Sequence, residues 1–337
     1  MNEHVCVCMK FFERSAGYLQ TAAFAGLWFG TEERGGEMAA GTIKSNRTER
    51  DPAGSPCPEN RAASQPDAFL TLRGAAAELS LPQTLDCGQA FRWRPSTEHP
   101  GWWEGAAMGR LLRMKAQGKD LLLECSREEY ENCWRRYLDM DRDYAGIRQA
   151  LSADPVLSEA CALYPGIRVL RQDPWETLCS FIISANNNIP RIKGIIERLC
   201  TGWGEPIADG WHTFPGPRTL AELSPEELAP LRAGYRTEYL LCCARQVASG
   251  EVDLDAIGEM EDEEGYRELL KLRGVGPKVA DCVLLFAYGR IQRVPMDVWM
   301  RRVCARLYPD GLPACAAPWA GIAQQFLFHY ARSRRLE

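Results

Sequence analysis

One short segment, Leu272–Ala280 (Leu-Arg-Gly-Val-Gly-Pro-Lys-Val-Ala), constrains the fold of this chain more than any other. Glycine commonly ends a helix and proline is favoured in a first turn, so one helix should end at Gly274 and another begin at Pro277. The first N–H groups of the second helix lack partners within it, and the helix dipole there favours an anion. The segment therefore predicts a helical hairpin that binds a phosphate group, although an ordinary corner between two helices would contain the same glycines.

Lys278 and Asp297 form a candidate catalytic pair. Lys278 lies in the first turn of the second helix, where positive potential and partial desolvation favour a neutral amine that can attack carbon. Asp297, nineteen positions later, stands where a further helix should begin. A carboxylate fixed there as an N-cap can also stabilise a developing positive charge. Alone, the lysine would be interpreted as a solvated side chain and the aspartate as a cap.

The rest of the chain predicts an α+β fold. Short apolar–polar alternations with Gly-containing turns predict antiparallel strands over residues 90–94, 102–104, 109–115 and 120–125. Capping boxes at Ser126–Glu129 and Ser224–Glu227, and the pair Asp173-Pro174, predict helix starts in the remainder. We expect an N-terminal extension without stable structure over residues 1–66, an antiparallel β domain over residues 67–140, and a mostly helical body over residues 141–337.

Composition excludes several classes of protein. The formal net charge of −5 is unusual for a nucleic-acid binder, but eight acidic and no basic residues lie between positions 251 and 264, while eight arginines lie between positions 290 and 337. The 14 cysteines and four histidines show no metal-ligand spacing, so we expect reduced thiols, no metal and no cofactor. No apolar run reaches the roughly 20 residues of a membrane span. We expect a cytoplasmic monomer.

Several motifs together resemble one family. Gly274–Lys278 followed by Val294–Asp297 resembles the helix-hairpin-helix DNA glycosylase superfamily. Ser180–Ile192, Cys87–Trp93 and Gly234–Arg236 are similar to motifs of its 8-oxoguanine DNA glycosylase branch. The similarity extends in the same order from about residue 69 to residue 332. It implies a helix-hairpin-helix body with a small N-terminal antiparallel sheet.

The resemblance also implies an activity. A bifunctional member excises 8-oxoguanine opposite cytosine in double-stranded DNA and then cuts the strand by β-elimination. Lys278 would be the nucleophile that attacks the sugar and forms a Schiff base, and Asp297 would be the catalytic carboxylate. Members that lack this lysine use water and only release the base.

Further site residues are implied by the same resemblance. The Gly88 carbonyl would accept the ring N–H that oxidised guanine has and guanine lacks, and Gln324 would contact the pairing edge of the base. Cys282 and Phe328 would sandwich the ring. Taken alone, Gly88 would be interpreted as a turn residue, and Cys282 and Phe328 as core.

On the DNA side, Asn186 would fill the vacated stack, Arg191 and Arg236 would contact the orphaned cytosine, and Tyr235 would be the wedge at the kink. The hairpin residues Gly274, Val275 and Gly276 would bind a phosphate. The asparagines at positions 186–188 are also ordinary turn residues.

Some features differ from the family pattern or leave alternatives open. Trp299 replaces a histidine of the eukaryotic members, which puts one phosphate contact in doubt and favours the bacterial branch. The cysteines after Cys243 lack the spacing of the iron–sulfur cluster of the endonuclease III branch. Two alternatives remain: a glycosylase of the same fold for another damaged base, and a non-catalytic DNA-binding module that uses the hairpin only as a phosphate clamp.

Overall fold

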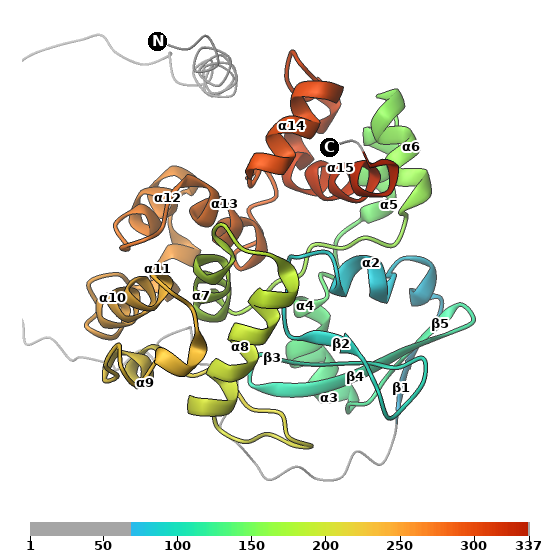
Figure 1. Ribbon diagram of the computed structural model, residues 1–337. Helices are drawn as coiled ribbons and strands as arrows, with labels where there is room; N and C mark the ends of the chain where they lie inside the picture. Colours follow the sequence, from blue (N-terminus) through green and yellow to red (C-terminus); the bar gives the residue numbers. More distant parts are fainter. Residues whose placement is uncertain (1–68, 336–337) are drawn as a thin grey trace, which may run out of the picture. The chain divides into compact units, whose positions relative to one another are not determined.

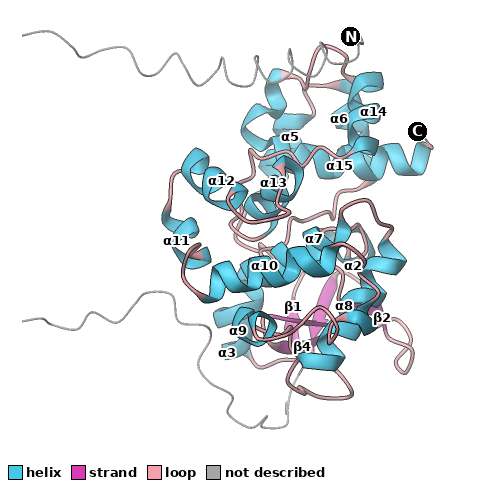
Figure 2. Cartoon of the chain, turned by 60° about the vertical axis from the view of Figure 1, so that its left-hand side comes forward, coloured by secondary structure: helices cyan, strands magenta, loops and turns pink. Residues whose placement is uncertain are grey.

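A computed structural model describes residues 69–335, so the expected extension over residues 1–66 lies outside the described part of the chain. The first described segment forms a five-stranded antiparallel sheet in the order β1-β5-β4-β3-β2 (Figure 1). Its strands are β1 (Leu70–Leu72), β2 (Trp93–Pro95), β3 (Trp103–Ala107), β4 (Arg110–Gln117) and β5 (Asp120–Leu123). Helices make up most of the chain after β5, which confirms the α+β class (Figure 2).

The central strands are joined by a tight hairpin. Residues Met108 and Gly109 connect β3 to β4 with φ values of 52° and 71°, as the favoured two-residue hairpin turn requires. The resulting register pairs Glu104 with Arg113. One side of the sheet is buried against the helical segment over residues 127–137, where Trp134 is fully buried.

The predicted strand over residues 90–94 is mostly wrong, because β2 begins only at Trp93. Phe91 and Arg92 precede it, and both are buried. The Arg92 guanidinium donates to Glu176 at 3.4 Å and to the carbonyl of His212. Such partners are what make a buried arginine tolerable, and an apolar–polar alternation does not reveal them.

The helices of the described chain are short to medium in length. Their bounds are α2 (Leu81–Leu85), α3 (Arg127–Glu129), α4 (Arg135–Tyr137), α5 (Tyr144–Leu151), α6 (Pro155–Leu163), α7 (Pro174–Ser184), α8 (Ile189–Trp203), α9 (Pro217–Ala221), α10 (Arg236–Ala248), α11 (Leu254–Glu259), α12 (Asp262–Leu270), α13 (Pro277–Phe286), α14 (Val298–Leu307) and α15 (Ala320–Arg334). None of these described helices is long and apolar enough to cross a membrane.

Side-chain caps begin several of them as predicted. Ser126 accepts from the N–H of Glu129, and Asp173 accepts from that of Glu176. The box at Ser224 also forms both of its hydrogen bonds, but the chain continues as turns and a short 3₁₀ segment instead of an α-helix. Pro230 lies within that segment and cannot donate the hydrogen bond that a continuing helix needs.

Two buried clusters hold these elements. One lies under the sheet and contains Trp93, Leu112 and Trp134. The other lies among the helices, where α7 packs against α13 and the rings of Phe181 and Phe286 stack with centroids 5.4 Å apart. This second cluster supports the start of α13, where Lys278 lies.

Substituting Gly105→Ala should destabilise the sheet. A Cβ at this position would lie 2.4 Å from the Trp93 ring and 2.9 Å from the Arg92 carbonyl, and both neighbours are buried. Overpacking of this kind costs about 1–3 kcal/mol, measurable by urea unfolding. Gly202→Ala is the control, because nothing lies within 4 Å of its Cβ in helix α8, and it should be neutral or slightly stabilising. Equal unfolding midpoints for the two variants would contradict this account.

The stability of the fold should also depend on pH through Glu176. Burial raises the pKa of Glu176 to about 7, although the charge of Arg92 acts in the opposite direction. The folded state therefore keeps a proton that the unfolded state releases near pH 4.5. The stability this proton provides is complete below pH 4.5 and is lost as the pH rises through 7.

Glu176→Gln should remove that part of the pH dependence. Between pH 5 and pH 8 its free energy of unfolding should fall less than that of the parent, by on the order of 1–3 kcal/mol. Glu263→Gln, whose side chain is 63% exposed, is the control. Parallel stability curves for the parent and Glu176→Gln would rule the explanation out.

Candidate active site

The turn between α12 and α13 has the geometry of the predicted hairpin. Gly274 has a φ of +87°, and a Cβ there would lie 2.4 Å from the ring of Tyr239, so this position requires glycine. No side chain caps α13. The N–H groups of Gly276, Lys278 and Val279 donate to no described residue. The hairpin thus presents several free donors at the positive end of a helix, an arrangement suited to a phosphate.

Lys278 is held by the end of helix α7. Its Nζ donates to the Ser184 hydroxyl at 3.2 Å and lies 4.7 Å from the centroid of the Phe181 ring. Ser184 in turn donates to the Phe181 carbonyl. The amine therefore does not extend freely into solvent, as a lone surface lysine would.

Asp297 is the N-cap of α14, as its position in the sequence predicts. Its Oδ1 accepts from the N–H of Met300 at 2.7 Å. Its Oδ2 accepts from no described residue and remains available. The cap therefore fixes the orientation of the carboxylate while one oxygen can face a developing cation.

Cys282 is a further candidate site residue and lies on the same helix as Lys278. It lies one turn after Lys278 on α13 and is buried. Burial raises the pKa of the Cys282 thiol to about 11, while the charge of Lys278 and a hydrogen bond with it act in the opposite direction, and Asp297 raises the pKa slightly further. Both charges therefore contribute to the environment of one buried thiol.

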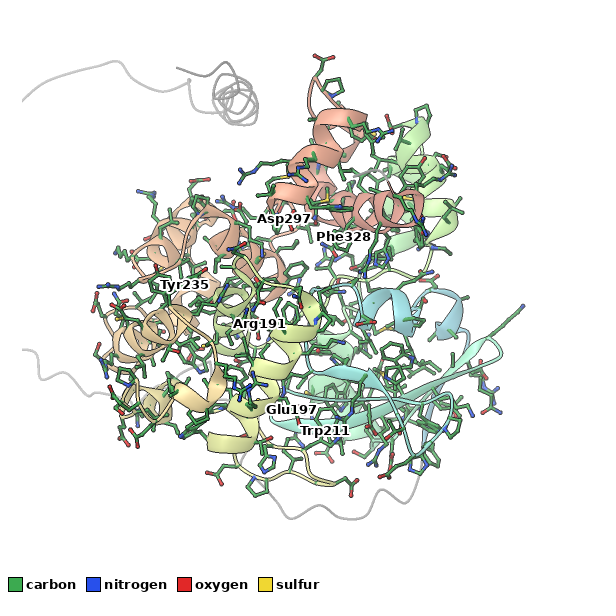
Figure 3. The ribbon with its side chains drawn as sticks, viewed as in Figure 1. Arg191, Glu197, Trp211, Tyr235, Asp297 and Phe328 are labelled. Atoms are coloured by element: carbon green, nitrogen blue, oxygen red, sulfur yellow. The ribbon has the colours of Figure 1, made fainter. Side chains whose placement is uncertain are left out.

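Phe328 and Gln324 occupy the same face of α15, one turn apart. The Phe328 ring contacts the ring of Trp299 edge-on, with centroids 4.9 Å apart, so Phe328 lies beside the start of α14 (Figure 3). Gln324 is buried. Gly88 has a φ of +89° in the loop before β2, and a Cβ there would lie 3.5 Å from Ile189 at the start of α8.

The residues expected to contact DNA gather around the turn between α7 and α8 (Figure 3). Asn186 is exposed and adopts the left-handed φ of 49°, Arg191 is exposed, and Tyr235 is 53% exposed. Arg236 differs from them because it is only 4% exposed. It donates to the carbonyls of Ala185 and Asn186 and stacks on the Tyr235 ring. In this structure Arg236 therefore holds the turn that carries Asn186.

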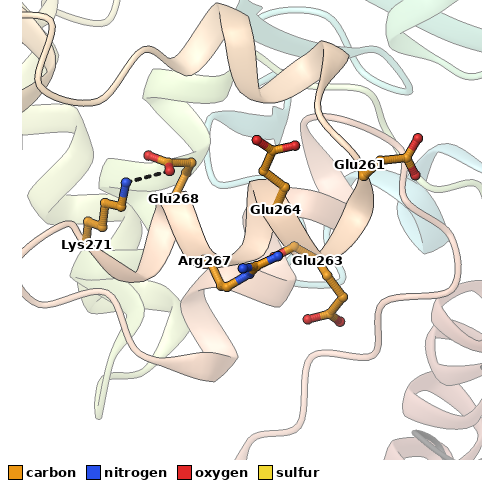
Figure 4. A pocket seen from close by; sticks show the side chains of 6 residues that line it. All are labelled: Glu261, Glu263, Glu264, Arg267, Glu268 and Lys271. Atoms are coloured by element: carbon orange, nitrogen blue, oxygen red, sulfur yellow. Dashed lines mark hydrogen bonds and ion pairs between the residues drawn. The ribbon is translucent and has the colours of Figure 1, made fainter. Parts of the chain in front are cut away.

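Two cavities lie elsewhere. One of about 420 Å³ lies on α12 and is lined mainly by acidic side chains (Figure 4), namely Glu261, Glu263, Glu264 and Glu268 with Arg267 and Lys271. Another of about 220 Å³ lies between the β2 region and α8, where Glu197 and Trp211 line it (Figure 3). Neither is lined by Lys278 or Asp297. The acidic cavity repels phosphate, and the cations of the second cavity are already paired with carboxylates.

Sequence reasoning missed the contribution of Phe181 and Ser184. Both lie in the motif Ser180–Ile192, but neither residue type suggests a role toward a lysine 94 or more positions away. Only the packing of α7 on α13 brings them to its amine. Among residues 69–335, no group of three or more His, Cys, Asp or Glu side chains could hold a metal ion.

Comparisons with known proteins agree with this geometry. Residues 179–311 match the model of HhH-GPD superfamily base excision DNA repair proteins, and residues 71–178 match that of the 8-oxoguanine DNA glycosylase N-terminal domain. The fold, the hairpin and the Lys278–Asp297 pair thus define a helix-hairpin-helix base-excision repair protein. More specifically, the chain belongs to the 8-oxoguanine DNA glycosylase family.

Individual relatives cover most of the chain. The N-glycosylase/DNA lyase of Saccharomyces cerevisiae is 40% identical over an aligned length of 259 residues, and the match covers 69% of this chain and 69% of that protein. A structure of MBOgg1 with a low-affinity DNA ligand is 38% identical, with a TM-score of 0.75, and the match covers 82% of this chain and 98% of that one. The Clostridium acetobutylicum 8-oxoguanine glycosylase/lyase, solved with double-stranded DNA containing cytosine opposite 8-oxoguanine, is 33% identical, with a TM-score of 0.72 and coverage of 81% and 100%.

The two roles of Asp297 can be separated by substitution. Asp297→Asn keeps an oxygen that caps Met300, so stability should change by less than about 0.5 kcal/mol, while loss of the charge should slow base release about 100-fold or more. Asp297→Ala should lose the cap as well, at about 1 kcal/mol. Single-turnover rates and thermal unfolding measure the two effects.

Asp143→Asn, which changes the cap of α5 in the same way, is the matched control and should leave the rate unchanged. A normal rate for Asp297→Asn would leave Asp297 with a structural role alone.

Proposed function

We propose that this chain excises 8-oxoguanine from double-stranded DNA opposite cytosine and then cuts the strand as a lyase. The observation that carries the proposal is the candidate pair formed by Lys278 at the start of α13, whose Nζ lies 3.2 Å from the Ser184 hydroxyl, and Asp297 at the start of α14, whose Oδ2 is free. Family membership supports it, because relatives similar to most of the chain are named N-glycosylase/DNA lyase. A hairpin that served only as a phosphate clamp would have no need for such a pair.

In the proposed reaction the Lys278 amine attacks the anomeric carbon of the damaged nucleotide. The bond from that carbon to the base breaks, and the base leaves with the bonding electrons and takes up a proton. Positive charge grows on the sugar as this bond lengthens, and the free Oδ2 of Asp297 stabilises it electrostatically. The covalent adduct becomes a Schiff base when the amine nitrogen forms a double bond to the anomeric carbon, the bond from that carbon to the ring oxygen breaks, and the ring oxygen takes up a proton. Loss of a proton from the neighbouring carbon then expels the 3′ phosphate.

Recognition of the base requires it to leave the duplex, as in other enzymes that act on bases. The Gly88 carbonyl accepts the N–H at position 7, which 8-oxoguanine has and guanine replaces with a lone pair. Cys282 and Phe328 lie on either side of the ring, and Gln324 contacts its pairing edge. The hairpin residues Gly274, Val275 and Gly276 contact a phosphate of the same strand. The free N–H of Gly276 donates to it, while the N–H of Val275 already donates to the Leu272 carbonyl.

On the opposite strand, Asn186 occupies the gap in the stack and Tyr235 acts as the wedge, while Arg191 and Arg236 contact the unpaired cytosine. Arg236 must exchange some of its bonds to Ala185 and Asn186 to do so. We further propose that the protein acts on DNA as a monomer, in the bacterial cytoplasm and without a cofactor.

The direct test is covalent capture with borohydride, which reduces a Schiff base to a stable link. The parent should be captured on an 8-oxoguanine·cytosine duplex, whereas Lys278→Gln should bind the duplex yet show neither capture nor cleavage. Lys271→Gln, a change of an exposed lysine at the end of the preceding helix, is the matched control and should behave as the parent does. Substantial cleavage by Lys278→Gln would remove this lysine from the mechanism.

A further inference from the structure

A buried polar cluster lies behind the proposed base-binding residues. It consists of Thr84, Cys87, Gln89, Gln324 and Gln325, none of them more than 5% exposed. Glutamine side chains are seldom buried so completely, because an amide removed from water needs hydrogen-bond partners. The proposed base contact gives Gln324 a role, but it does not explain why Gln325, the next residue of α15, is also a buried glutamine.

The hydrogen bonds of the cluster run in a defined direction. Cys87 Sγ donates to the Thr84 carbonyl at 3.4 Å and approaches Gln325 Oε1 at 4.0 Å. Burial raises the pKa of the Cys87 thiol to about 11, so Cys87 keeps its proton and acts as a donor near neutral pH. Gln325 then uses its Nε2 to donate to Gln324 Oε1 at 2.6 Å.

The same cluster fixes the loop that contains Gly88. Gln89 Nε2 donates to the carbonyls of Thr84 and Arg168, and its Oε1 accepts from the N–H of Leu170. Cys87 and Gln89 flank Gly88, so the backbone on both sides of the Gly88 carbonyl is held by buried side chains. The loop and α15 are thereby joined through Cys87 and Gln325.

The consequence for Gln324 is that its side-chain amide has one fixed orientation, here called its sense: which way the Oε1 and the Nε2 point. A side-chain amide can exchange its oxygen and nitrogen by a half turn, but a donor facing its Oε1 opposes that exchange. Gln324 Oε1 accepts from Gln325, and Gln324 Nε2 donates to no described residue. The amide therefore keeps free N–H donors and one remaining acceptor position on its oxygen.

That sense matters because purine bases present opposite patterns. Guanine has an O6 acceptor beside an N1–H donor, whereas adenine has an N6–H donor beside an N1 acceptor. An amide whose nitrogen faces position 6 and whose oxygen faces position 1 pairs with guanine. The same amide after a half turn pairs with adenine. The 8-oxo forms of both bases carry an N–H at position 7, so the Gly88 carbonyl does not distinguish them.

We propose that Gln325 is a positioning residue that fixes the sense of the Gln324 amide and thereby sets the preference for 8-oxoguanine over 8-oxoadenine. The inference rests on the proposed function, since it concerns the same base-binding site. Gln325 itself touches no substrate in this scheme, because its Nε2 donates to Gln324 and its Oε1 faces the Cys87 thiol 4.0 Å away.

The test compares two substitutions with opposite hydrogen-bonding capacity. Gln325→Leu removes the donor and leaves the amide free in both senses, so the ratio of single-turnover base-release rates, 8-oxoguanine over 8-oxoadenine, should fall roughly tenfold. Gln325→Glu presents only acceptors when ionised and selects the opposite sense, so at a pH above the pKa of the buried carboxyl the ratio should fall further. The expected order of the ratio is then parent, Gln325→Leu, Gln325→Glu. Below that pKa the protonated carboxyl can donate to Gln324 as Gln325 does, so the ratio of the Gln325→Glu variant should rise again as the pH falls.

Cleavage of a preformed abasic site is the internal control, because it uses Lys278 but contains no base. Its rate should stay within about twofold of the parent in both variants. A purely structural defect would instead slow abasic-site cleavage and the release of both bases together.

If Gln325→Glu does not fold, Cys87→Val and Cys87→Ser give a similar comparison, because the Cys87 thiol faces Gln325 and Gln325 in turn donates to Gln324. Cys87→Ser keeps a donor toward Gln325 and should retain the ratio, whereas Cys87→Val should lower it. An unchanged ratio in Gln325→Leu and Cys87→Val, or a parallel loss of abasic-site cleavage, would overturn the inference. Failure of the parent itself to release 8-oxoguanine would instead refute the proposed function.

Discussion

The packing of α7 against α13 is the contact on which the active site depends. Both helices are buried along most of their length, and the stacked rings of Phe181 and Phe286 lie between them. This contact brings the end of α7 to the start of α13, where Phe181 and Ser184 surround the Lys278 amine. A lysine in a first helical turn is ordinarily solvated and opposed by the helix dipole. Here the Phe181 ring and the Ser184 hydroxyl restrict the position of the Lys278 amine. This positioning makes the lysine a candidate nucleophile.

Sequence reasoning succeeded where the signal was local. The hairpin at Gly274, the cap at Asp297 and the antiparallel sheet each depend on a few neighbouring residues, and the fold class could be predicted from them. It failed where distant partners decide the outcome. The alternation around Arg92 predicted a half-exposed strand, but Glu176 and His212 make burial of the arginine possible. The Ser224 box formed its bonds without a helix because Pro230 prevents the continuation.

Charge is distributed in a way that reconciles an acidic chain with a proposed DNA substrate. One group of acidic residues lines the cavity on α12 (Figure 4), and Lys278 is not among the lining residues. Arg293 near this group is already paired, with Asp262 and Glu263. At the proposed DNA surface the attraction comes instead from backbone N–H groups and a few exposed cations such as Arg191. Net charge is therefore a poor guide to what a protein of this size binds.

The turn between α7 and α8 shows how folding can prepare a surface for a large partner. The backbone of Asn186 adopts a left-handed conformation, which residues other than glycine seldom adopt. The buried Arg236 guanidinium donates to the carbonyls of Ala185 and Asn186 and so holds this turn. Hydrogen bonds within the protein therefore stabilise the bent backbone of this segment before any DNA binds. A helix of DNA would thus meet a turn whose backbone is already bent, and most of the work of distortion would fall on the nucleic acid.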